Sequence, residues 1–259
     1  MVASKATATH TADLSEISVG DAAAPRLELT EWATRYGLVA GITTRENGFN
    51  LGLSSEEPAG NVSARWRAFR GAFAGRFPGV VTGYQCHGTT VRWYDRGVEG
   101  WLQVGEVDGH ATDRKGLLLT VTVADCIPVY LAAPGSGAVA LLHAGWRGTA
   151  DRILARGVHA LTQHALVRPD ELVMHCGVGI CGTCYEVGSE VSARLTGEAG
   201  NGATHVDLRA VLARQAAELG IAAVSLSPHC SAHHRDLFYS HRASKGRDGR
   251  MVAFLGRPK

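Results

Sequence analysis

No stretch of the sequence approaches the ~18 consecutive apolar residues that a membrane-spanning helix requires. The charge is nearly balanced, with 26 Lys+Arg against 24 Asp+Glu and a formal net charge of +2, and aromatic residues amount to only 7%. These shortages argue against an integral membrane protein, against binding of nucleic acid through a basic surface, and against a platform for base stacking.

Cysteine is also too sparse, at six in 259 residues, for a small secreted fold held together by disulfides. The first twenty residues lack the apolar core of a secretory signal peptide. We therefore expect a cytoplasmic protein with reduced thiols. Residues 1–25 show no sustained hydrophobic period and are expected to form a flexible tail. Residues 26–259 contain neither repeats nor a long linker, and we expect them to form one domain.

Short apolar runs bounded by glycine or proline predict strands at 38–43, 80–84, 89–93, 117–123, 129–132, 138–143, 172–176 and 221–226. Helical periodicity predicts helices at 62–73, 149–164, 186–195 and 207–219, the last with Asp207 as N-cap and Gly220 as its stop. Several strands follow one another without a helix between them. The pattern therefore predicts an α/β protein of the α+β type, with mixed β-sheets flanked by helices, rather than a doubly wound sheet.

Three possible metal ligands lie at or just beyond the ends of predicted strands: His87 in QCHG, Cys126 in ADCIP and His143 in HAGWRG. Zn²⁺ prefers imidazole and thiolate ligands, and a set of three leaves a fourth position for water or substrate. Spacing alone does not separate this set from a buried cysteine and two hydrogen-bonded histidines. Asp125, beside Cys126, could orient a ligand or shuttle a proton, or could simply cap a helix or turn.

The segment CGVGICGTC, residues 176–184, combines the C-x4-C-x2-C spacing of plant-type iron–sulfur proteins with a G-x-G-x-x-G pattern. The two patterns compete for the same atoms, and no strand ending in Asp or Glu follows at the distance a dinucleotide-binding fold needs. We expect instead a tight glycine-rich turn in which Cys176, Cys181 and Cys184 are free thiols. For the cluster of His229, His233 and His234, an ordinary polar loop is a simpler expectation than a second metal site.

Arginines become relevant if the substrate is anionic, because a guanidinium binds phosphate through two parallel hydrogen bonds. Arg147 lies in the loop that follows His143, Arg65 and Arg67 share one predicted helix, and Arg250 follows a glycine-rich turn. Most arginines are simply solvated, so only Arg147 gains weight from its position.

The same segments resemble the multicopper polyphenol oxidase (laccase) domain family, also called the YfiH-like family, over roughly residues 37–256. The most specific blocks are VADCIPV at 123–129 and HAGWRG at 143–148. Weaker matches are QCHG at 85–88, GFNLG at 48–52, CGTCYEVG at 181–188 and FYSHRASKGRDGRM at 238–251. Their order and spacing agree along the chain. The resemblance implies a single-domain YfiH-like sandwich.

The resemblance also implies site residues. The family's metal ligands fall on His87, Cys126 and His143, and the asparagine of its SLNLG block falls on Asn50. The family's Asn-Arg pair in the helix has no clean match, because Arg65 lies one place early and Arg67 one place late. The substrate-binding residues that the resemblance implies are Asn50, Arg65, Arg67 and Arg147. A family tyrosine is replaced by His241.

The function implied by the resemblance is zinc-dependent processing of a purine nucleoside: phosphorolysis of adenosine or methylthioadenosine, deamination of adenosine, or both. The partners implied are a small nucleoside substrate and phosphate, with no nucleic acid or membrane, and the chain would be a monomer or homodimer. Three alternatives stay open. They are a Cys–His hydrolase acting on a peptidoglycan precursor or another amide, a copper phenol oxidase, and an inactive binding paralogue. Copper is less favoured than zinc, because the three methionines offer no obvious axial ligand.

Overall fold

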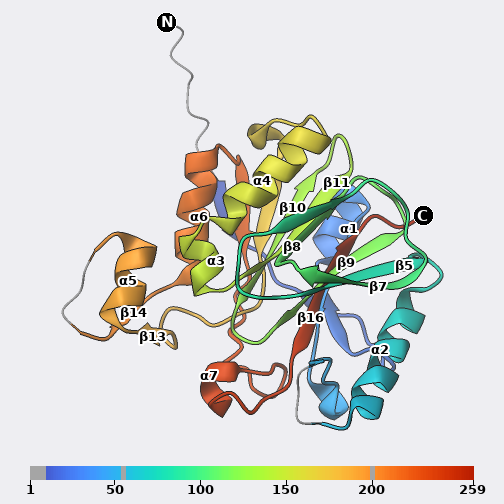
Figure 1. Ribbon diagram of the computed structural model, residues 1–259, viewed down its shortest axis with the longest axis horizontal. Coiled ribbons are helices and arrows are strands. Elements are labelled where there is room, and N and C mark those ends of the chain that lie inside the picture. The colour runs from blue at the N-terminus through green and yellow to red at the C-terminus, as the bar shows by residue number, and fades with distance from the viewer. Residues whose placement is uncertain (1–9, 54–56, 199–201) are drawn as a thin grey trace, which may run out of the picture.

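The computed structural model describes residues 10–53, 57–198 and 202–259, and its main feature is a pair of seven-stranded mixed sheets (Figure 1). The first sheet has the order β1 (His10–Asp13), β15 (Ala223–Leu226), β12 (Val173–Cys176), β10 (Ile127–Ala133), β11 (Ala138–Ala144), β8 (Gly109–Thr112), β6 (Val91–Tyr94). The second has the order β2 (Ile17–Ser18), β3 (Arg26–Glu28), β4 (Val39–Thr43), β16 (Met251–Gly256), β9 (Leu117–Val123), β5 (Gly79–Tyr84), β7 (Gly100–Glu106).

The sheets pack face to face, and helices cover their outer faces. Alternation along β10 shows the layering: Val129 and Leu131 face α4 (Ile153–His164) and α6 (Leu208–Leu219), whereas Tyr130 and Ala132 face the second sheet. The Tyr130 hydroxyl donates a hydrogen bond across the interface to the carbonyl of Gly41, at 2.8 Å. α2 (Ala59–Phe73) covers the far face of the second sheet (Figure 1). The expected α/β single-domain sandwich is therefore confirmed.

The remaining elements are short. A two-stranded ribbon pairs β13 (Glu186–Val187) with β14 (Thr204–His205). The other helices are α1 (Thr30–Tyr36), α3 (Trp146–Ala150), α5 (Ser189–Thr196) and α7 (His241–Ser244), with 3-10 turns at Glu46–Gly48 and Pro169–Glu171. Within the described ranges, no helix is both long and apolar enough to cross a lipid bilayer.

Each predicted strand corresponds to an observed one, but two predicted helices differ from the structure. The helix expected at 149–164 is broken, because Arg152 adopts a left-handed conformation with φ of 64° between α3 and α4. The helix expected at 186–195 begins as β13, and α5 starts only at Ser189. For α6 the predicted ends are confirmed: the Asp207 side chain accepts hydrogen bonds from two backbone N–H groups, and Gly220 has a φ of 83°.

The N-terminal segment requires a correction. Residues 1–9 lie outside the described residues, but residues 10–25, expected to belong to a flexible tail, are held against the domain. β1 pairs in parallel with β15 of the first sheet, and β2 pairs with β3 of the second. Between them Glu16 is buried, with its carboxylate 3.2 Å from His175 Nε2 and 2.6 Å from the Ser227 hydroxyl that donates to it. Backbone pairing and one buried carboxylate hold a segment that has little apolar surface.

Glu16 should therefore make a measurable contribution to stability. Burial alone raises the pKa of its carboxyl, but the bonds from His175 and Ser227 lower that pKa below its ordinary value. Glu16→Ala leaves the buried His175 without this partner, so we expect a loss of about 3 kcal/mol in the free energy of unfolding, measured with urea at pH 7. The exposed Asp13→Ala is the control and should lose much less.

The sign of the pH dependence follows from the lowered pKa. The contribution of Glu16 is complete above its unfolded pKa of about 4.3 and is lost as the pH falls through the folded value. The difference between wild type and Glu16→Ala should therefore shrink in acid. Equal stability of the two proteins at pH 7 would contradict the role given to Glu16.

Candidate metal centre and cavity

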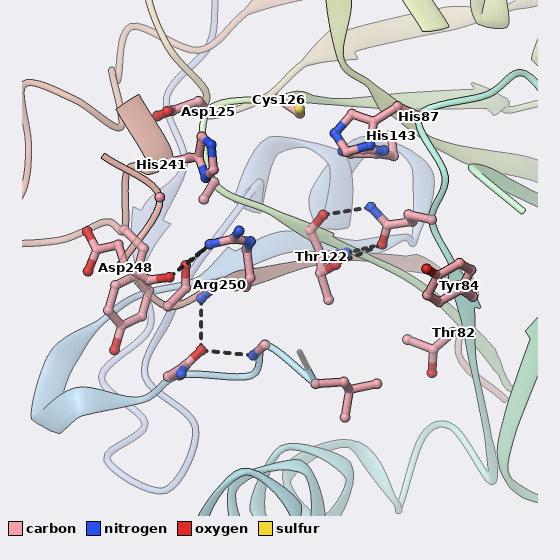
Figure 2. A pocket seen from close by; sticks show the side chains of 18 of the residues that line it. Thr82, Tyr84, His87, Thr122, Asp125, Cys126, His143, His241, Asp248 and Arg250 are labelled. Carbon is pink, nitrogen blue, oxygen red and sulfur yellow. Dashed lines mark hydrogen bonds between the residues drawn. The ribbon is translucent and has the colours of Figure 1, made fainter. Parts of the chain in front are cut away.

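Three potential ligands converge at neighbouring strand ends. His87 follows β5, Cys126 lies between β9 and β10, and His143 is the penultimate residue of β11. One ligand atom from each lies within 4.8 Å of the others, and the two imidazole rings meet edge to face with their centroids 4.8 Å apart. Figure 2 shows the three side chains along one side of the cavity. The structure thus brings the predicted His/Cys/His set together.

A buried carboxylate that the sequence analysis missed holds this set in place. Asp108 is fully buried, and its Oδ1 lies 2.8 Å from His143 Nδ1. Its two oxygens also accept hydrogen bonds from the backbone N–H groups of Cys86, His87 and Gly88, at 2.8–3.1 Å. With Nδ1 bound to Asp108, His143 presents Nε2 to Cys126 and the cavity, as a carboxylate–histidine–metal arrangement requires. No local pattern around Asp108 signals this role, because its side-chain partners lie 20–35 residues away.

The ionisation of these groups follows from their contacts. Burial alone raises the pKa of the Cys126 thiol, but the charge and hydrogen bonds of His143 and His87 lower it to about 6. Burial alone lowers the pKa of His143, but the adjacent Cys126 and Asp108 raise it to about 9. The pKa of the Asp108 carboxyl, which burial alone would raise, is held well below its usual range by His143 and the backbone N–H groups. A thiolate is therefore favoured at Cys126, and thiolate is the form that binds a metal.

Two glycines make the close approach possible. A Cβ on Gly145 would lie 2.9 Å from the His87 ring and 3.0 Å from Cys126 Sγ. A Cβ on Gly179 would lie 2.4 Å from Ile127 Cδ1 and 2.8 Å from the carbonyl oxygen of Asp125. The glycine pattern at 177–182 thus serves close packing against the sheet, as expected from the sequence. The structure also contains no disulfide among its six cysteines, all of which lie in the described ranges.

The ligand set opens into a cavity of about 1720 Å³ between the strand ends and the α7 segment. Asn50, Arg65, Asp125 and Arg147 line it, as does Arg250. Arg67, which we had expected to contact substrate, is exposed on α2 and does not line the cavity. The reason is helical geometry: Trp66 points into the core, so its two neighbours lie on opposite sides of the helix, and Arg65 is the one that faces the cavity.

Most of the polar groups around the cavity already have protein partners. Arg65 pairs with Glu57 at 2.9 Å, and Asn50 binds the same carboxylate through its amide nitrogen while its Oδ1 accepts from the backbone N–H groups of Gly52 and Arg250. Arg147 differs: within the described residues its guanidinium has no ion pair or hydrogen bond and lies over the Trp146 ring at 4.5 Å. Arg147 is therefore available to an anionic ligand.

Asp125 combines a strained backbone with a capping role. Its φ is 81°, and its carboxylate accepts hydrogen bonds from the Ser231 hydroxyl and from the backbone N–H of Arg242 in α7, both at 2.6 Å. Asp125 thus caps the first turn of α7 and ties it to the Cys126 loop. His241, in the same turn, faces the cavity beside Asp125 (Figure 2).

Neither of the two methionines in the described part of the chain offers an axial copper ligand. Met174 and Met251 are buried in β12 and β16 and do not line the cavity, and Met1 lies outside the described residues. The donor set present, one thiolate and two imidazoles, fits the borderline-soft Zn²⁺ ion, whose three-ligand sites keep one open position.

Fold and site together define a two-sheet α/β protein with a His₂Cys centre at its strand ends. The sequence model described as "Multi-copper polyphenol oxidoreductase laccase" matches residues 33–258, and the chain belongs to this family. The chain is 32% identical over 248 residues to purine nucleoside phosphorylase YlmD of Geobacillus stearothermophilus, covering 85% of this chain and 90% of the relative.

Two further similarities are informative. The chain is 32% identical over 164 residues to adenosine deaminase RL5 from an unknown prokaryotic organism, covering 58% of this chain and 62% of that protein. The crystal structure of YlmD from Geobacillus stearothermophilus superposes with a TM-score of 0.85 at 29% identity, covering 94% of this chain and all of the other. The fold expected from the sequence is thereby confirmed at the level of a solved relative.

The role of Asp108 leads to a prediction about metal affinity. Asp108→Asn keeps the size of the side chain but removes the charge that orients His143, so the affinity of this centre for Zn²⁺ should fall about 10–100-fold, measured by competition with a chromophoric chelator. Asp95→Asn, at an exposed position away from the cavity, is the matched control. Unchanged affinity in folded Asp108→Asn protein would show that the carboxylate does not support the ligand.

Proposed function

We propose that this chain is a zinc-dependent enzyme that processes purine nucleosides, with phosphorolysis of adenosine or methylthioadenosine as its main reaction and deamination of adenosine as the second. The observation that carries the proposal is the convergence of His87, Cys126 and His143 along one side of a cavity that Arg147 also lines. The names of the relatives, purine nucleoside phosphorylase and adenosine deaminase, support the same substrate class.

His87, Cys126 and His143 would hold the zinc ion. When bound, zinc supplies positive charge that stabilises anions and activates water. Asp108 keeps His143 oriented through Nδ1, and the carboxylate is itself fixed by three backbone N–H groups. The ligands therefore need little rearrangement to receive the ion, which favours tight binding.

The cavity has room for two ligands at once. Its volume of about 1720 Å³ exceeds the ~300–1,000 Å³ of an ordinary small-molecule site. Arg147 can donate two hydrogen bonds to phosphate from the rim of the metal centre. Tyr185 and Trp146 also line this region, and a guanidinium lies over each ring: that of Arg242 is 5.1 Å from the Tyr185 centroid and that of Arg147 is 4.5 Å from the Trp146 centroid. Burial raises the pKa of Tyr185 to about 12, so its hydroxyl stays a neutral donor.

In phosphorolysis an oxygen of dihydrogen phosphate attacks C1′ of the ribose as the bond from C1′ to the purine nitrogen breaks. The purine leaves with the electron pair of that bond and takes a proton from the phosphate, so free base and ribose 1-phosphate are formed. The contribution of this chain is to hold the two reactants in line, with Arg147 binding and orienting the phosphate that attacks C1′.

The decisive assay incubates the zinc-loaded protein with adenosine, with and without inorganic phosphate. We expect adenine in the presence of phosphate, and inosine as a minor product that does not need it. The products are separated by liquid chromatography. Neither product from fully metallated protein would contradict the proposed function and favour a binding paralogue.

Arg147→Ala tests the phosphate site. Loss of a charge-assisted hydrogen bond costs about 1.5–3 kcal/mol, so the KM for phosphate should rise at least about tenfold while the KM for adenosine changes less. Arg67→Ala, an arginine that does not line the cavity, should behave as wild type. An equal rise in both KM values would indicate general damage to the cavity and not loss of a phosphate ligand.

A second candidate function rests on the same residues. Cys126 and His143 can form a thiolate–imidazolium pair, and the Asp108 carboxylate orients the imidazole. This is the arrangement of a Cys–His hydrolase. Because both mechanisms need Cys126, replacing it by alanine does not separate them. We prefer the zinc mechanism to the hydrolase mechanism, because His87 adds a third potential metal ligand that a thiol hydrolase does not require.

Cys126→Asp separates the two mechanisms. Aspartate binds Zn²⁺ through oxygen at ~2.0–2.2 Å but has no sulfur nucleophile. If zinc carries the chemistry, this variant should retain metal and reduced turnover, and chelated wild-type protein should lose activity and regain it with zinc. An active chelated enzyme that a thiol alkylator blocks would overturn the zinc mechanism.

A further inference from the structure

A second group of metal-binding side chains lies outside the His/Cys/His centre. It consists of Cys181, Cys184, Cys230 and His233, and one ligand atom from each lies within 4.8 Å of all the others. The group shares no residue with the first centre. The sequence predicts separate thiols in a turn for these cysteines and a polar loop around His233, so the convergence of the four side chains is a finding of the structure.

Two loops supply these ligands, and each contributes a pair with C-x2 spacing. In the loop between β12 and β13, the carbonyl of Cys181 accepts the backbone N–H groups of Cys184 and Tyr185, both at 3.1 Å, and this turn places the two thiols side by side. In the loop after β15, the carbonyl of Cys230 accepts the N–H of His234 at 2.9 Å, which places His233 over Cys230. Pairs of ligands at this spacing are typical of structural zinc sites.

The backbone fixes the two loops relative to each other. Gly179 and Cys230 form an isolated parallel β-bridge, and the N–H of Ser231 donates to the carbonyl of Gly179 at 3.0 Å. The N–H of Cys181 points at Cys230 Sγ at 3.3 Å, a contact that stabilises a thiolate. Arg209 reinforces this junction by donating to the carbonyls of Gly179 and His229.

The four side chains are close enough to share a single ion, because one ligand atom from each lies within 4.8 Å of the others. Cys184 Sγ lies 3.1 Å from His233 Nε2, and Cys181 Sγ lies 3.7 Å from Nδ1 of the same ring. A single ion would bind only one of these two nitrogens, so the side chains would shift slightly to form the site. With Zn–S of about 2.3 Å and Zn–N of about 2.0–2.1 Å, the ligand atoms of a tetrahedral site lie roughly 3.5–3.8 Å apart. An iron–sulfur cluster of the plant type would also need Cys176, but that side chain is buried in the core between the first sheet and its helices.

We propose that Cys181, Cys184, Cys230 and His233 bind one structural Zn²⁺ ion in a closed Cys₃His site. The ion would join the loop that lines the cavity through Ile180 and Tyr185 to the loop that follows β15. On one side of the site Tyr185 follows Cys184 and lines the cavity, and on the other Ser231 follows Cys230 and holds the Asp125 carboxylate. The proposal concerns metal content and stability, and it does not depend on the reaction proposed above.

Metal counting on matched variants tests the site. Full-length protein, purified under reducing conditions and saturated with zinc before gel filtration, should carry two zinc ions per chain by inductively coupled plasma mass spectrometry. His143→Ala should keep one ion, held by the Cys₃His site, and Cys184→Ser and His233→Ala should also keep one, held by the first centre. Cys176→Ala, which removes a thiol outside both groups, should keep two.

Cobalt identifies which site remains occupied. His143→Ala protein loaded with Co²⁺ should show the intense visible and thiolate charge-transfer bands of a tetrahedral site with three sulfurs, and these bands should be absent from the double variant His143→Ala/Cys184→Ser. Chelation of His143→Ala protein should lower its melting temperature. A metal-free His143→Ala protein that is folded, or a disulfide between Cys181 and Cys184 in protein kept reduced, would overturn the proposal.

Discussion

The arrangement of the candidate metal ligands depends on the buried carboxylate of Asp108. A charged group without solvent is costly unless its lone pairs are filled, and here backbone N–H groups from the turn at 86–88 and the imidazole of His143 fill them. The dependence runs both ways. The carboxylate shapes the turn that carries His87, and the turn makes it possible to bury the carboxylate. The side chain of Asp108 thus holds His87 through its backbone and His143 through its ring, without belonging to the candidate ligand set itself.

The sheet sandwich provides the frame for that carboxylate. Asp108 lies just before β8, and its carbonyl also accepts the N–H of His143 in β11, at 2.7 Å. Cys126 lies where the chain leaves β9 in the second sheet and enters β10 in the first. The centre therefore sits where the two sheets meet. The left-handed backbone of Asp125 turns the chain at that crossing, and a hydrogen bond to α7 secures it.

Much of the fold follows from the sequence because the central strands are buried on both faces. β9, β10 and β11 read as continuous apolar runs, and their predicted positions agree with the structure to within two residues at each end. β1 and β2 could not be found in this way, because edge pairing and the Glu16 contact hold them and neither has an apolar signature. The break at Arg152 likewise leaves no mark in the helical period.

Some residues of the candidate site could likewise be predicted from the sequence, and others could not. His87, Cys126 and His143 could be named because each lies at a strand end, and the family resemblance then selected them from the other histidines and cysteines. Asp108 could not, since its partners are remote in sequence. The second set of possible ligands, Cys181, Cys184, Cys230 and His233, could not be recognised from spacing. The C-x4-C-x2-C pattern includes Cys176, which is a core residue, and it omits His233, which only the fold brings close to the cysteines. Helical geometry, and not sequence spacing, separates Arg65 from Arg67.

The N-terminal segment has a consequence for how copies of this chain meet one another. β1 pairs with β15, and β2 pairs with β3, so one short segment supplies the outermost strand at one edge of each sheet. An uncovered edge presents unpaired N–H and C=O groups that can template the addition of a strand from another molecule. The nine residues from His10 to Ser18 thus cover the edges of β15 and β3 and leave strands of only four and two residues outermost, and short edge strands limit pairing between molecules. A proteolytic cut after Ser18 would uncover β15 and β3 and should first lower the solubility at high protein concentration.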